Sequence, residues 1–164
     1  MRAFEITGNK DLMGKLLLKQ DFDGFCLEEM ELVMSHTYRI DGRIRREFYE
    51  GEEQTLPSEP FVRWGDEKEL VTGLIKGKKT PLRFNVVLRT GPEETRKLML
   101  DAGLKEAEQE AIEGFVCTIR FEKGAITLVS GTTYRTFTLS KDAEKAWDAE
   151  MERFLRKADI AFSE

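Results

Sequence analysis

Histidine and cysteine are scarce in this chain of 164 residues, which contains one histidine and two cysteines. The histidine, His36, lies in an expected strand, and no GxSxG motif is present, so we expect no histidine-based nucleophilic site. Cys26 and Cys117 have apolar neighbours on expected strands, and neither has a CxxC partner or a nearby histidine. They are therefore expected to be two buried thiols in a reducing cytosol.

Long hydrophobic runs are also missing. Apolar runs are short, such as residues 16–18 and 86–88, whereas a membrane-spanning helix needs about 20 apolar residues. The first residues show no stretch of secretory length and no cleavage pattern. We therefore expect a cytoplasmic protein with no membrane partner.

Recognisable metal and phosphate motifs are absent as well. Residues 73–80 resemble a Walker loop, but three residues rather than four separate the glycines, and a helix precedes them where a strand is needed. Residues 21–24 resemble the start of a calcium loop, but Phe25 and Cys26 stand where oxygen ligands would follow. The sequence predicts no cofactor and no metal, and it favours a non-enzymatic role.

The composition is that of a folded soluble domain, with 40% hydrophobic and 35% charged residues and 11 phenylalanines. The length fits one domain, residues 1–164. Apolar periodicity predicts strands separated by helices, which favours an α+β fold with a largely antiparallel sheet. Expected strands are residues 2–7, 25–49, 61–64, 81–89, 115–122, 125–130 and 132–139. Expected helices are residues 10–18 (capped by Asn9), 66–76, 92–103 and a long amphipathic C-terminal helix, 140–158.

The segment from Tyr38 to Phe48 carries a strong hairpin signal, because Asp41-Gly42 lies between two alternating runs. A two-residue loop would mix apolar and charged side chains on one face. A three-residue loop, residues 40–42 with Gly42 in the left-handed conformation, separates them. A sheet buries one face, so we expect the three-residue loop and an arginine-rich hairpin surface.

Basic residues gather in two stretches. Residues 39–46 carry a net charge of +3 and residues 76–89 carry +5, although the whole chain carries −5. Clustered bases can bind phosphate backbones, but they can also pair with acidic residues within the chain or across an oligomer. The candidate anion-binding or nucleic-acid-binding residues are Arg39, Arg43, Arg45, Lys76, Lys78 and Lys79.

The stretches 38–44 (with Phe48) and 75–81, together with residues 121–124 and Trp147-Asp148, resemble an uncharacterised domain-of-unknown-function family from clostridia-like Firmicutes. The resemblance covers nearly the whole chain, and it implies a small cytoplasmic bacterial protein without assigning an activity. Two units of strand, helix and strands also resemble, in element order alone, the half-domains of sliding DNA clamps. In a clamp, helix faces would meet DNA through Lys10, Lys15, Lys19, Lys68 and Lys76.

These observations predict a non-enzymatic domain that binds a protein partner, or a second copy of itself, through a sheet edge or the basic hairpin. The alternative is a nucleic-acid or anion-binding module that uses the two basic stretches. A small-molecule enzyme would instead require a concave pocket with clustered carboxylates.

Overall fold

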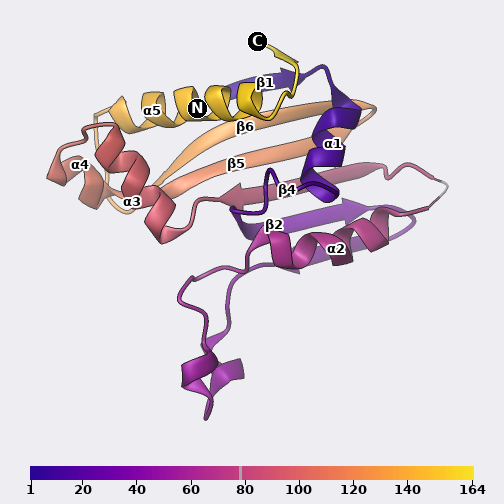
Figure 1. The fold of residues 1–164 in the computed structure, drawn as a ribbon, viewed down its shortest axis with the longest axis horizontal. Coiled ribbons are helices and arrows are strands. Elements are labelled where there is room, and N and C mark those ends of the chain that lie inside the picture. Colours follow the sequence, from indigo (N-terminus) through magenta and orange to yellow (C-terminus); the bar gives the residue numbers. More distant parts are fainter. Residues whose placement is uncertain (78) are drawn as a thin grey trace.

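The computed structural model describes residues 1–77 and 79–164, and it confirms an α+β fold with an antiparallel sheet. Seven strands form one sheet in the order β3-β2-β4-β5-β6-β1-β7 (Figure 1). The strands are β1 (Arg2–Ile6), β2 (Cys26–Val33), β3 (Thr37–Asp41), β4 (Arg83–Arg89), β5 (Ile112–Glu122), β6 (Ala125–Tyr134) and β7 (Phe162–Ser163). The helices are α1 (Asn9–Leu17), α2 (Trp64–Ile75), α3 (Pro92–Asp101), α4 (Glu106–Ala111) and α5 (Asp142–Lys157).

Alternate residues of the central strands form the hydrophobic core. Phe84, Val86 and Leu88 of β4 are buried, whereas Asn85 and Val87, which point to the opposite face, are half-buried. Helices α1, α2 and α5 cover the buried face, as Figure 1 shows. α5 lies against β6 and α2 lies against β2, and Figure 1 shows α1 and α3 at opposite ends of the sheet region between them.

The predicted hairpin around Asp41-Gly42 is wrong. β2 and β3 pair with Met30 opposite Ile40 and Val33 opposite Thr37, so the chain reverses at residues 34–36. The Met34 amide donates to the His36 carbonyl at 2.9 Å and closes this turn. Asp41 ends β3, and Gly42 continues beside β2, where its amide donates to the Glu28 carbonyl.

Close backbone packing explains why glycine occupies position 42. A Cβ atom there would lie 2.7 Å from the Leu27 carbonyl carbon and closer still to its oxygen. Gly42 is not among the residues with positive φ. The glycine therefore reflects close approach of two strands, and the sequence analysis had read it as a turn residue.

Other expected boundaries need smaller corrections. β5 begins at Ile112, earlier than expected, and supplies partners for residues 132–134, so these residues extend β6 and form no third strand. Gly8, rather than Asn9, precedes α1 as its cap, and the Asn9 amide donates to the Gly124 carbonyl. α2 begins at Trp64, and the sequence analysis missed β7.

Residues 43–60, which we call the arm, extend away from the sheet beyond β3 (Figure 1). The arm contains two 3₁₀ helices, Arg46–Tyr49 and Glu53–Thr55, and neither contains a buried residue. Phe48 is 81% exposed. The expected strand over residues 25–49 is therefore wrong beyond β3, because residues 43–49 belong to this surface segment.

Candidate functional site

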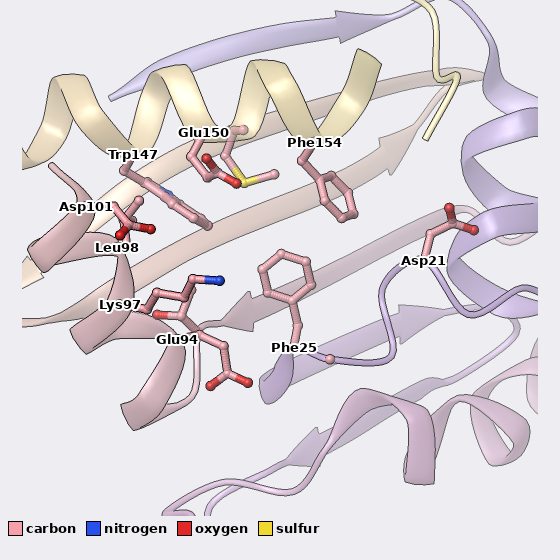
Figure 2. Close-up of a pocket in the computed structure, with 12 residues that line it drawn as sticks. Asp21, Phe25, Glu94, Lys97, Leu98, Asp101, Trp147, Glu150 and Phe154 are labelled. Carbon is pink, nitrogen blue, oxygen red and sulfur yellow. The ribbon is translucent and has the colours of Figure 1, made fainter. Parts of the chain in front are cut away.

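A pocket of about 380 Å³ lies between α3, α5 and the loop before β2 (Figure 2). It occupies the part of the buried sheet face that neither α5 nor α2 reaches. α3 contributes one side, and α5 contributes the other side. Phe25, from the loop, packs edge-to-face against Phe154 of α5.

The floor of the pocket is aromatic and firmly held. Phe25 and Phe154, which line the pocket, form a cluster with the buried Phe22, and the ring centroids lie 5.0–6.0 Å apart. Trp147 packs on Phe115 of β5, and its indole nitrogen donates to the Val116 carbonyl at 2.8 Å. Because edge-on aromatic packing and this hydrogen bond fix the rings, the pocket is formed before any ligand enters.

Carboxylates surround this apolar floor. Asp21 comes from the loop, Glu94 and Asp101 from α3, and Glu150 from α5, against one cation, Lys97. Glu94 pairs with Arg63 at 3.3 Å, and Glu150 pairs with Arg153. Among the described residues, Asp21 and Asp101 make no ion pair, so the rim keeps an excess of negative charge.

Next to the pocket, Arg63 ties the loop before β2 to the base of the arm. Its guanidinium donates to the Gly24 carbonyl and to Glu59, in addition to its contact with Glu94. The Cys26 thiol donates to Glu59 at 3.4 Å. The rim of the pocket is therefore connected through ion pairs to the arm.

Both cysteines are free and buried, as expected from the sequence. Burial, followed by the nearby Glu59 carboxylate, raises the pKa of Cys26 to about 12. Burial alone raises the pKa of Cys117 to about 12. Both thiols are therefore protonated near neutral pH and are poor nucleophiles.

The structure separates the basic residues predicted from sequence. Arg43 and Arg45 follow the end of β3, beside the end of β4, whereas Lys76 and Lys79 precede the start of β4 (Figure 1). β4 has seven residues, so the two groups lie on the order of 20 Å apart at about 3.3 Å per residue. Lys78 lies outside the described residues.

Two of the predicted arginines are paired with carboxylates. Arg39 contacts Glu31 at 2.9 Å, and Arg45 contacts Asp41 at 3.0 Å. Arg43 makes no ion pair within the described residues, and its guanidinium lies 5.6 Å from the centre of the Phe61 ring. The arginines therefore do not form the continuous basic face that the hairpin model predicted.

The pocket could not be predicted from the sequence, although parts of it were visible there. Trp147, Met151 and Phe154 belong to the apolar stripe predicted for the C-terminal helix, where they read as ordinary core residues. On α3, the spacing of Glu94, Lys97 and Asp101 places all three on the pocket side of one helix. That spacing was visible in the sequence, but the sequence did not show that α3 and α5 lie on opposite sides of one pocket.

Comparison with known proteins identifies a family but no activity. The family model for DUF5721, a family of unknown function, matches residues 15–163, and the chain belongs to this family. The resemblance to an uncharacterised family is thereby confirmed. No curated protein and no solved structure matches the chain. The likeness to sliding clamps stays a prediction from element order.

Two kinds of feature were not found in the described part of the chain. No helix in the described part of the chain is both long and apolar enough to cross a bilayer. Within residues 1–77 and 79–164, no three histidine, cysteine, aspartate or glutamate side chains gather to hold a metal ion.

Proposed function

We propose that this chain is a non-enzymatic, cytoplasmic binding domain whose pocket between α3 and α5 accepts a basic, amphipathic segment of a partner protein. The observation that carries the proposal is the combination of an aromatic floor and a carboxylate rim in one preformed pocket. The proposed surface differs from the sheet edge or basic hairpin expected from sequence, while the expected class of function is the same.

The chemistry of the pocket favours a partner with two kinds of group. An apolar side chain of the partner would pack on Phe25, Phe154 and Trp147 and lose contact with water. Lysine or arginine side chains on either side of it would meet Asp21 and Asp101. Cations also bind favourably over aromatic faces, which adds to the charge complementarity.

Lys97 opposes this ligand, and the opposition makes the proposal testable. Its side chain extends from α3 toward Phe25 in Figure 2, where it neutralises part of the rim. Removal of this charge should strengthen the binding of a cationic peptide, whereas removal of carboxylates should weaken it. A general effect on folding would not strengthen peptide binding in one variant and weaken it in the other.

The experiment is calorimetric titration of the protein with a short peptide of alternating lysine and leucine residues. We expect binding that is about tenfold weaker for Asp21→Asn/Asp101→Asn and tighter for Lys97→Gln. The control is Glu5→Gln/Glu69→Gln, which removes two exposed carboxylates elsewhere and should leave the dissociation constant unchanged. If the control variant binds the peptide equally weakly, the loss of binding arises from net charge alone and the proposal fails.

Nucleic-acid binding is the second candidate function. The observation that favours it is that Arg43, Lys76 and Lys79 make no ion pair within the described residues. Binding of a labelled duplex or single strand should then fall steeply with salt, and Arg43→Glu/Arg45→Glu should abolish it. Absence of binding at low salt would eliminate this candidate.

A further inference from the structure

A second and larger cavity, about 800 Å³ in volume, lies where β4 ends and β5 begins. Its walls come from the base of the arm, from α3 and α4, and from the start of β5. None of the aromatic residues of the α3–α5 pocket lines it. Its volume lies within the range of small-molecule sites in proteins.

Arg89 is the most unusual residue of this cavity, because it is a charged side chain that is only 8% exposed. Among the described residues its guanidinium makes no hydrogen bond and one ion pair, from Nη1 to Glu28 Oε1 at 3.4 Å. A guanidinium has five N–H donors, and no Arg89 nitrogen is among the fully enclosed polar atoms without a partner, so its donors open onto the cavity. Arg89 lines the cavity, so a ligand there can satisfy them.

The surrounding residues hold the Arg89 guanidinium in place. It lies 4.9 Å from the centre of the Phe61 ring. Gly114 provides the space for it, because a Cβ atom at that position would lie 2.6 Å from Nη2 of Arg89. The position of the guanidinium is thus fixed by an aromatic ring and a glycine, and neither of them uses its hydrogen-bonding capacity.

Arg43 stacks on the same ring, which brings a second guanidinium to this end of the cavity. Arg96 and Arg135 also line the wall. Glu106, Glu110 and Glu113 line it too, but no ion pair among the described residues joins these glutamates to the four arginines. The cavity therefore presents cationic groups and acceptor groups that do not pair with each other.

We propose that this cavity binds a small phosphorylated molecule, with its phosphate between Arg43 and Arg89. A phosphate monoester has up to two negative charges and three acceptor oxygens, so it can engage both guanidiniums at once, whereas one arginine suffices for a carboxylate. The glutamates would accept hydrogen bonds from hydroxyl groups on the rest of the molecule. The proposal does not rest on the peptide pocket, with which this cavity shares only Thr90 among its lining residues.

The test is titration at constant ionic strength with three probes, namely inorganic phosphate, ribose 5-phosphate and succinate. Binding is measured by calorimetry and by the change in unfolding temperature. We expect ribose 5-phosphate to bind most tightly and to raise the unfolding temperature. Arg89→Lys keeps the charge but loses the planar fork, and Arg43→Gln changes an exposed side chain. Each should weaken ribose 5-phosphate binding at least about tenfold.

The matched control is Arg83→Gln, at the other end of the same strand and outside the cavity. It should bind ribose 5-phosphate as the unmodified protein does. If Arg89→Lys fails to fold, Arg43→Gln alone decides the outcome. The proposal is overturned if neither phosphate compound binds, if succinate binds more tightly than both, or if Arg43→Gln binds as well as the control.

Discussion

At the scale of single residues, a local sequence signal can identify a required residue and still give the wrong reason for it. Asp41-Gly42 has the composition of a hairpin turn, yet the chain turns at residues 34–36, and Gly42 is required by the nearby Leu27 backbone. Composition records that glycine is needed at a position. It does not record whether the need arises from a positive φ or from close packing, because the second depends on a neighbour distant in sequence.

The close approach at Gly42 predicts a large loss of stability for Gly42→Ala. The added methyl group would collide with backbone atoms of Leu27, which cannot rotate away as a side chain can. We expect the free energy of unfolding to fall by about 3 kcal/mol or more. Denaturant unfolding measures the change.

Gly73→Ala is the comparison for this prediction. Gly73 lies in α2 with open space around its Cβ position, so alanine there should raise stability by about 0.5–1 kcal/mol. A small effect of Gly42→Ala would show that β2 and the residues after β3 are less closely packed than the structure indicates.

Glu152 predicts a dependence of stability on pH. Hydrogen bonds from Arg156, and then from Arg2, hold the pKa of this carboxyl below its ordinary value of 4.5. The contribution of the Glu152 carboxylate to the free energy of unfolding is therefore fully present above pH 4.5. It is lost as the pH falls through the lower pKa of the folded state. The stability difference between the natural protein and Glu152→Gln should shrink over that acid range.

Urea unfolding at a series of pH values measures this difference. Glu69→Gln is the control, since Glu69 makes no ion pair among the described residues, and its difference from the natural protein should not vary in this way. A Glu152→Gln difference that stays constant from neutral pH into the acid range would contradict the prediction.

Whole elements were predictable where their period was strong. The alternating pattern of β4 and the apolar stripe of α5 were both visible in the sequence and are present in the structure. The short strand β7 was not visible, since two residues carry no period. The 3₁₀ helices of the arm were missed for the same reason, because they bury nothing and so impose no apolar pattern.

The arm is the element that should unfold locally at the lowest cost. Its two 3₁₀ helices contain no buried residue, so opening them exposes little apolar surface. Brief trypsin digestion of the folded protein should cleave first after Arg45 or Arg46, as mass spectrometry of the fragments would show. First cleavage within α2 or α5 would contradict this assignment.

At the scale of the whole molecule, the sequence predicted the class of fold but not the neighbours in the sheet. β1 pairs with β6, which brings Arg2 beside Ser130, and no local pattern specifies a pairing across that separation. The pocket depends on the same kind of information, because α3 and α5 meet only once the strand order is set. The proposed function therefore rests on contacts between distant segments, whereas the prediction from sequence placed it in a sheet edge or in charged stretches.

Amide NMR titration of the isotopically labelled protein with the lysine–leucine peptide tests the peptide pocket most directly. We expect the largest shifts on residues 21–25, 94–101 and 147–154, together with a shift of the Trp147 indole N–H. Shifts concentrated on the arm or on β3, or no shifts at peptide concentrations that saturate calorimetric binding, would contradict a binding pocket between α3 and α5.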